Sequence, residues 1–185
     1  MAFSKIAAEN LGGSTLPALA GGSLTGVGGL TEVDTWRLTT TFSGEQNWGS
    51  MERVDTDASG HIGTGLTYSS PYFSFPSTGY YLLQATANFH KQSSGQRVIT
   101  LRIHFTTDNS NYNVVALSNC LIADETAGSE NLYANAFTSK LFDITDISNQ
   151  KFHLSTLANN DGNVKTRGDT DDTISHFTIM KLANT

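Results

Sequence analysis

The stretch from residue 68 to residue 89 limits the possible folds more than any other part of the sequence. Phe73 and Phe75 alternate with polar neighbours, a short segment containing Pro76 and Gly79 follows, and apolar residues then recur at every second position. A period of two is the pattern of a strand with one buried face. Pro76 has no N–H for a central ladder and belongs at a strand end, and Gly79 tolerates the positive φ of a tight corner. We therefore predict a strand, a corner and a second strand.

The spacing F-x-F-P-x-x-G-x-Y resembles the signature of the superfamily that contains tumour necrosis factor and the globular head of the q subcomponent of the first complement component. The matching residues, which we predict to be a core motif, are Phe73, Phe75, Pro76, Gly79 and Tyr81. This sequence departs from the family pattern at Pro71 or Tyr72, where a glycine is usual, and that departure concerns the start of the first strand. The resemblance implies a jelly-roll β-sandwich that forms homotrimers and whose last strand lies beside its first.

The rest of the chain repeats the strand pattern. Hydrophobic residues make up 38% and charged residues 15% of the 185 residues, with 17 glycines, which is more typical of an all-β domain than of a helical one. The further predicted strands cover residues 36–42, 48–54, 62–68, 97–105, 112–123, 131–144, 152–156 and 173–182. We therefore expect an all-β jelly-roll head domain over residues 32–185.

Residues 1–31 have a different character and are predicted to form an extended arm rich in glycine and leucine. Single apolar residues, separated by Gly, Ser and Thr, have no helical period; they are Leu11, Leu16, Leu19, Leu24, Val27 and Leu30. One chain alone offers them no partners, so three chains wound together or a groove on another protein would have to bury them. The composition resembles the N-terminal attachment segments of bacteriophage tail-fibre and virion proteins, which implies an arm that anchors the protein in a particle. A disordered tail is the alternative.

Charge and missing signals exclude several classes of protein. The net charge of −6 argues against nucleic-acid binding, which needs a basic face, and against docking on anionic lipid. No window approaches the roughly 20 apolar residues of a membrane span. The first residues lack the basic start and long apolar core of a secretory signal, so we expect synthesis in the host cytoplasm and a place in the virion. The single cysteine, Cys120, is expected to be a small buried hydrophobic side chain.

We expect no catalysis and no cofactor. The histidines are scattered without metal-ligand spacing; they are His61, His90, His104, His153 and His176. The nucleophile elbow G-x-S-x-G is absent, as are the phosphate loop and the dinucleotide fingerprint. The acidic loop at residues 159–172 offers hard oxygen ligands for calcium in Asp161, Asp169, Asp171 and Asp172. It lacks the calcium-binding loop pattern, so solvated turn residues are the favoured interpretation and no metal is predicted.

Two polar loops are candidates for contact with a receptor. Their residues are Asp108, Asn109, Asn111, Tyr112, Asn160 and Asp161. Asparagine side chains can bind sugar hydroxyls, and the tyrosines Tyr68, Tyr72, Tyr112 and Tyr133 can stack on sugar rings if they are exposed. The alternative is that at least half of these tyrosines pack in the core.

Together these features predict a bacteriophage virion structural protein, a homotrimeric fibre or appendage. Its N-terminal arm would bind other virion proteins, and its head would contact host surface carbohydrate. A capsid decoration protein and a free-standing carbohydrate-binding module are the alternatives.

Overall fold

The computed structural model describes residues 29–56, 58–92, 96–123, 131–158 and 162–185. Every regular element in these residues is a β-strand, and none of them belongs to a helix long and apolar enough to cross a membrane. The strands are β1 (Val33–Leu38), β2 (Phe42–Ser43), β3 (Gln46–Asn47), β4 (Met51–Arg53), β5 (Thr67–Ser69), β6 (Tyr72–Ser74), β7 (Gly79–Gln92), β8 (Gln96–Thr106), β9 (Asn113–Ile122), β10 (Asn131–Ile144), β11 (Lys151–Leu157), β12 (Lys165–Thr166) and β13 (His176–Ala183).

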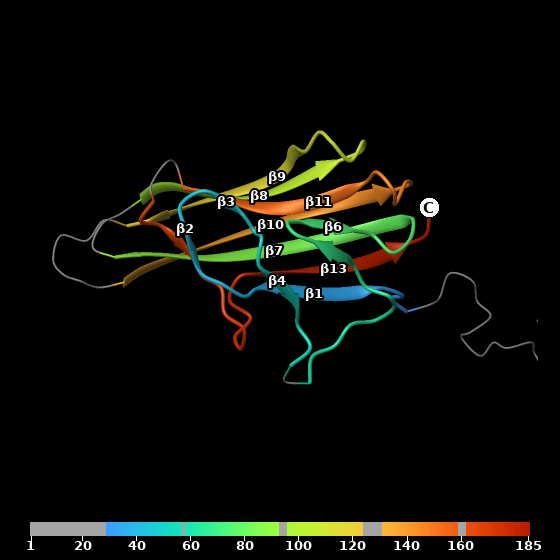
Figure 1. Ribbon diagram of the computed structural model, residues 1–185, viewed down its shortest axis with the longest axis horizontal. Coiled ribbons are helices and arrows are strands. Elements are labelled where there is room, and N and C mark those ends of the chain that lie inside the picture. Colours follow the sequence, from blue (N-terminus) through green and yellow to red (C-terminus); the bar gives the residue numbers. More distant parts are fainter. Residues whose placement is uncertain (1–28, 57, 93–95, 124–130, 159–161) are drawn as a thin grey trace, which may run out of the picture.

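These strands form two antiparallel sheets packed face to face (Figure 1). Sheet A runs β10-β7-β13-β1-β4, and the short strands β12 and β2 continue it beside the second half of β7. Sheet B runs β5-β6-β11-β8-β9, with β3 also on β11. The last strand pairs with the first, Val33 opposite Met180. The expected all-β jelly-roll sandwich is confirmed.

The predicted corner joins the two sheets. The chain leaves sheet B after β6 and enters sheet A at Gly79, whose φ is 144°. A side chain at Gly79 would have its Cβ against the Lys181 side chain and the carbonyl of Ala183. The residues before the corner are not one strand, as predicted, but the hairpin β5–β6 with its turn at Ser70–Pro71. Pro71 has no N–H for the ladder, and this explains why the strand ends there.

Two other predicted strands are shorter than expected. The strand predicted at residues 36–42 ends at Leu38, because the chain turns there and Thr41 bonds to the loop at Gly168 instead. The strand predicted at residues 48–54 is reduced to β4, with Trp48 fully buried outside it and donating through Nε1 to Thr156 Oγ1 at 3.1 Å. Conversely, β12 lies within the stretch that the sequence predicted to be a loop.

Aromatic rings fill the space between the sheets. Phe73 is fully buried, with ring-centroid distances of 5.2 Å to Trp36, 4.7 Å to Tyr68, 5.2 Å to Phe152 and 4.8 Å to Phe177. These rings come from both sheets, so this one side chain contacts both walls of the core. Two further members of the predicted motif continue the cluster: Phe75 and Tyr81 are 4% and 1% exposed, with their ring centroids 5.0 Å apart.

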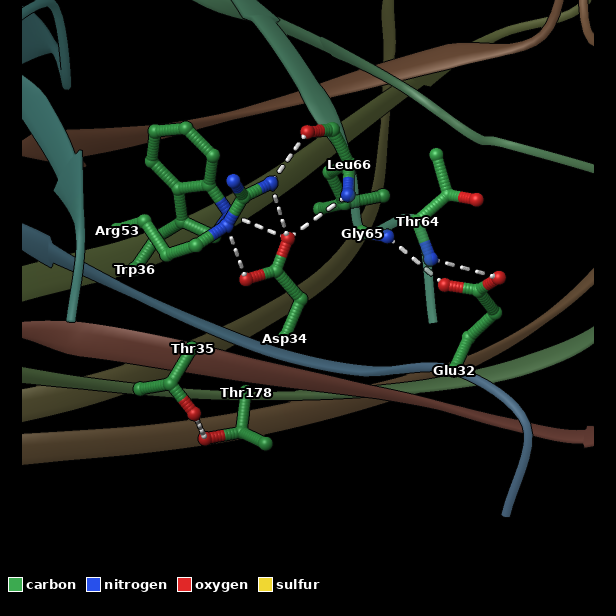
Figure 2. A network of polar contacts seen from close by, with 9 residues as sticks. All are labelled: Glu32, Asp34, Thr35, Trp36, Arg53, Thr64, Gly65, Leu66 and Thr178. Carbon is green, nitrogen blue, oxygen red and sulfur yellow. Dashed lines mark hydrogen bonds and ion pairs between the residues drawn. The ribbon is translucent and has the colours of Figure 1, made fainter. Parts of the chain in front are cut away.

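A polar network fastens the first strand to the loop beside it (Figure 2). The Asp34 carboxylate is 1% exposed. It accepts hydrogen bonds from Trp36 Nε1 at 2.9 Å, from Arg53 Nε and Nη2 at 2.9 and 3.1 Å, and from the Leu66 amide at 2.7 Å. Glu32 accepts from the Thr64 and Gly65 amides. A buried carboxylate is stable only when it is paired and hydrogen-bonded, and these donors meet that condition.

The two ends of the sandwich differ. The end that we call the terminal end carries both the start of β1 and the end of β13, together with the loops at residues 75–78, 107–112 and 145–150. At the opposite end, the far end, β7 stops and β8 starts, and β11 stops. Both ends of the described chain therefore leave on the same side.

Truncation of the central ring tests this account of the core. Phe73→Ala is expected to lower the free energy of unfolding by about 3–5 kcal/mol, because it removes a buried aromatic side chain and leaves a cavity. Urea denaturation measures the loss. Ile147→Ala, at a residue that is 42% exposed, is the control and should change the free energy by no more than about 0.5 kcal/mol. If Phe73→Ala lowers the free energy of unfolding no more than Ile147→Ala does, this account of the core is contradicted.

Candidate assembly surface

The outward face of sheet A carries a row of apolar side chains across its whole width. The backbone register pairs Ile62 with Val33, Val33 with Met180, Met180 with Leu82, and Leu82 with Leu141. Directly paired residues of an antiparallel sheet point to the same face, so these five side chains form one row, which we call the apolar band. Core residues such as Leu83 and Ile179 occupy the alternate positions and face inward.

Strand β10 forms the edge of this face and exposes large apolar residues. Tyr133, Phe137 and Leu141 are 54%, 55% and 53% exposed, and their spacing of four places them on the same side of the strand. Their neighbours Ala136 and Phe142 are buried. Edge strands of monomeric proteins are usually protected by charge, proline or a covering segment. Arg167 lies over part of the Tyr133 ring, but all three side chains remain more than half exposed, so this edge has the character of an interface.

Polar groups occupy the face beyond the apolar band. Thr35 and Thr178 pair through their hydroxyls at 2.9 Å. Nearer the far end, Arg167 lies over the Tyr133 ring at 5.3 Å, and β12 places Lys165 opposite His90. Burial and the charges of Lys165 and Arg167 lower the pKa of His90. The face is therefore mainly apolar towards the terminal end, and towards the far end it carries basic groups beside the exposed Tyr133.

Strand β9 exposes a second apolar set, on the outward face of sheet B. Leu117 and Leu121 are 51% and 61% exposed. Cys120 was expected to be buried, but it is only half-buried, because β9 is the edge strand of its sheet and its inward residues are covered from one side only. Burial raises the pKa of the Cys120 thiol to about 11, so the thiol is not activated as a nucleophile.

The first predicted receptor loop is bound to itself and lies at the terminal end. The Asp108 carboxylate accepts hydrogen bonds from the Ser110 amide at 2.9 Å, the Asn111 amide at 2.8 Å and Asn111 Nδ2 at 2.7 Å, and these bonds hold the pKa of Asp108 far below its usual range. Asn109 has a φ of 56° in this turn. These bonds hold Asp108 and Asn111 together in the turn and use both oxygens of the Asp108 carboxylate.

The tyrosines proposed to stack on sugars have different surroundings. Tyr112 is stacked on Tyr72 with the ring centroids 4.6 Å apart, so each ring already uses one face. Tyr68 packs in the aromatic core against Trp36 and Phe73. Of the four tyrosines, Tyr133 is the one that is more than half exposed, and it lies on the outward face of sheet A.

The other predicted site residues fall in or beside parts that the structure does not describe. Asn160 and Asp161 lie outside the described residues, although the described residue before them, Ala158, is at the far end. The predicted receptor residues therefore belong to opposite ends of the sandwich. Successive antiparallel strands run in opposite directions, so counting the predicted strands between the two loops could have shown that the loops lie at opposite ends. Of the arm residues, Leu30 is described and is 45% exposed; Leu11, Leu16, Leu19, Leu24 and Val27 lie outside the described residues.

The acidic loop forms a turn in its described part. The Asp169 carboxylate accepts the Asp171 amide at 2.7 Å and the Asp172 amide at 3.2 Å, which lowers the pKa of Asp169. Asp171 and Asp172 are exposed. No group of three or more potential metal ligands occurs among the residues that the structure describes, and Asp161 is not among them.

A stacked pair of histidines, the buried His153 and the half-buried His104, was missed by the sequence interpretation, which treated the histidines as scattered. His153 is 5% exposed, and neither ring nitrogen has a hydrogen-bond partner in the described part of the chain. Its ring stacks on His104 at 4.3 Å, and the rings of Tyr72 and Tyr112 meet it edge-on at 5.5 and 5.1 Å. His104 Nε2 pairs with Ser155 Oγ at 2.8 Å. His153 on β11 pairs with His104 on β8. The spacing of these residues in the sequence does not show that the two strands are neighbours.

Comparison with known proteins supports the fold assignment through structure alone. No family model and no curated protein matches the sequence. Among solved structures, the Eiger TNF of S. frugiperda superposes with a TM-score of 0.60 at 13% identity, covering 85% of this chain and 96% of that one. Murine APRIL at pH 5.0 superposes with a TM-score of 0.59 at 12% identity, covering 82% and 98%. The domain is a tumour-necrosis-factor-like jelly roll.

The buried histidine makes the stability of this tumour-necrosis-factor-like domain depend on pH. Burial, with a smaller effect of His104, lowers the pKa of His153 from 6.5 to about 4. The unfolded chain therefore binds a proton at a pH where the folded chain does not, and stability is lost as the pH falls from 6.5 towards 4. The expected loss at this site is up to about 3 kcal/mol.

Replacement of the ring tests this dependence. The free energy of unfolding of the wild type should fall between pH 7 and pH 4.5. His153→Phe and His153→Gln should each make that fall smaller, whatever effect they have on stability at pH 7. Urea denaturation at each pH measures it. A fall as large as that of the wild type in both variants would contradict the assignment to His153.

Proposed function

We propose that this chain is a structural protein of a bacteriophage virion, which forms a homotrimeric appendage through its jelly-roll head and is anchored in the particle by its N-terminal arm. The observation that carries the proposal is the outward face of sheet A. An apolar band crosses that face, and its edge strand leaves Tyr133, Phe137 and Leu141 more than half exposed.

The geometry of the face favours a ring of copies. The exposed side chains of β10 lie at one edge of sheet A, whereas the partly buried Leu82 and Met180 lie near its middle. An edge that packs on the middle of the next copy makes a heterologous contact, and such contacts close into rings when the rotation allows it. The superfamily that the sequence resembles closes the ring with three copies, and the tumour-necrosis-factor-like fold supports the same number here.

The particle context rests on the arm. The apolar residues in its Gly/Ser/Thr background resemble phage attachment segments, and the described chain starts at the terminal end of the sandwich. An anchored terminal end would direct the far end away from the particle. Contact with a host carbohydrate is therefore proposed at the far end, and not at the loop of Asp108, which lies on the arm side.

A charge at the edge of the face tests the trimer. Leu141→Glu is expected to convert the trimer to monomers, because the interface would bury an unpaired carboxylate. Sedimentation velocity measures the species present. Leu117→Glu is the matched control, since Leu117 is 51% exposed on the other sheet and Leu141 is 53% exposed; it should remain trimeric. A wild-type protein that sediments as a monomer would remove the proposal of a trimer.

Removal of the arm tests the place in the virion. A variant lacking residues 1–28 is expected to fold, since all described residues remain, but to be missing from particles assembled in its presence. Immunoblotting of purified particles measures incorporation. Electron microscopy of wild-type particles locates the protein on the tail, as expected for a fibre, or on the head, as expected for a decoration protein. Full incorporation of the shortened variant would contradict anchoring through the arm.

A further inference from the structure

The outward face of sheet B, on the other side of the molecule from the apolar band, carries a cluster of four rings towards the terminal end. The rings belong to Tyr72 on β6, His104 on β8, Tyr112 just before β9 and His153 on β11. We call them the ring cluster. Cross-strand pairing sets His104 directly opposite His153, and directly paired residues point to the same face of an antiparallel sheet. The cluster therefore unites segments that are distant in the sequence.

The His153 ring is the centre of this cluster. It is stacked on His104 with the ring centroids 4.3 Å apart, and Tyr72 and Tyr112 meet it edge-on at 5.5 and 5.1 Å. The two tyrosine rings are stacked on each other at 4.6 Å and are themselves only half-buried, whereas His153 is 5% exposed. Tyr72 and Tyr112 thus separate His153 from solvent, and we call this pair the tyrosine cover.

The position under the cover suits a neutral imidazole and not a charged one. Neither ring nitrogen of His153 has a hydrogen-bond partner in the described part of the chain. A proton added to this ring would therefore be buried without an acceptor, and a buried unpaired charge is costly. Burial, with a smaller effect of His104, accordingly lowers the pKa of His153 to about 4.

The charged groups around the cluster offer a protonated His153 no compensation. On β8, Arg102 lies two residues from His104 and, after burial, lowers the pKa of His104 as well. On β11 itself, Lys151 lies two residues before His153 and so on the same face of the strand. No ion pair joins a carboxylate to either histidine among the described residues. A positive charge on His153 would therefore face further positive charge.

The carboxylates of the adjoining loops are already ionised and stay so in mild acid. Hydrogen bonds from Asn111 lower the pKa of Asp108, and those from Asn149 lower the pKa of Asp146. Burial, then Tyr72 and Asp108, raise the pKa of Tyr112, so the cover itself is uncharged over the same range. A change of the cover between pH 7 and pH 4.5 would therefore originate at the histidines.

We propose that His153 is an acid-sensitive switch for the tyrosine cover: the uncharged ring is packed under Tyr72 and Tyr112, and when it takes up a proton the cover opens and lets the imidazolium reach water. The sheets stay together, because Phe152 and Leu154 on either side of His153 face the core and take no part in the opening. Tyr112 ends a loop and Tyr72 belongs to a three-residue strand, and such segments open locally at less cost than the whole domain.

This inference goes beyond the proposed function and concerns a single domain. It uses no residue of the arm and none on the face of sheet A that is assigned to the trimer. Failure of the switch would leave the proposed assembly intact, and a monomeric protein would leave the switch intact. With a pKa of about 4 under the cover and about 6.5 in water, the ratio of open to closed molecules rises up to about fiftyfold between pH 7 and pH 4.5.

Hydroxyl-radical labelling of the full-length protein, read by mass spectrometry, tests the opening. Labelling of Tyr72 and Tyr112 should increase at least about threefold from pH 7 to pH 4.5. Tyr133, which is 54% exposed on the other sheet, is the internal reference and should not change, and the fully buried Phe73 should stay protected. In His153→Phe and in His153→Gln, which carry no ring that can be protonated, the increase should be absent.

Three results would overturn the switch. The first is equal labelling of the tyrosine cover at both pH values in the wild type. The second is an increase in both His153 variants as large as that of the wild type. The third is labelling of Phe73 that increases as much as that of Tyr112, since the whole domain would then have unfolded.

The pKa of His153, measured by an NMR titration, gives an independent test, because the coupling between proton and cover is reciprocal. Tyr112→Ala removes half of the cover and should raise the pKa of His153 from about 4 to above about 5, towards its value in water. Tyr112→Phe keeps the ring and should leave the pKa near that of the wild type, as should Tyr133→Ala on the other sheet. An unchanged pKa in Tyr112→Ala would overturn the switch.

Discussion

Contact between the two sheets through a single ring governs this structure. Phe73 touches rings from β1, β5, β11 and β13, and so joins both sheets at the centre of the core. At the corner after β6, Gly79 permits the approach of Lys181. The pairing of the last strand with the first places Trp36 and Phe177 side by side against this ring.

The same packing leaves one sheet face without a cover. The core uses the inward side chains of sheet A, and the outward side chains of β7, β13 and β10 then present an apolar band and an exposed aromatic edge. Apolar surface of this kind is unfavourable in water, and the proposed contact with another copy would bury it. The proposed assembly would therefore depend on the fold, because the same strand register aligns Leu82 with Met180 and Leu141.

The terminal end is where the proposed anchoring would begin. The start of β1 is held by the carboxylates of Glu32 and Asp34, so the arm leaves from a fixed point. The loop of Asp108 lies on that side as well, whereas the loops beside β12 lie at the far end. Anchoring and recognition would therefore use opposite ends of one sandwich, a separation that the order of residues along the chain does not show.

The sequence by itself determined the all-β class, the buried faces of the long strands and the corner at Pro76 and Gly79, because alternation and turn chemistry are local properties. It did not determine that Ser70–Pro71 interrupts the strand, that Cys120 sits on an edge, or that His153 is buried against His104. The apolar band could not be predicted from the sequence either, since its residues come from segments that are far apart along the chain. Only strand pairing decided these features, because a side chain's burial depends on which neighbour the fold places beside it.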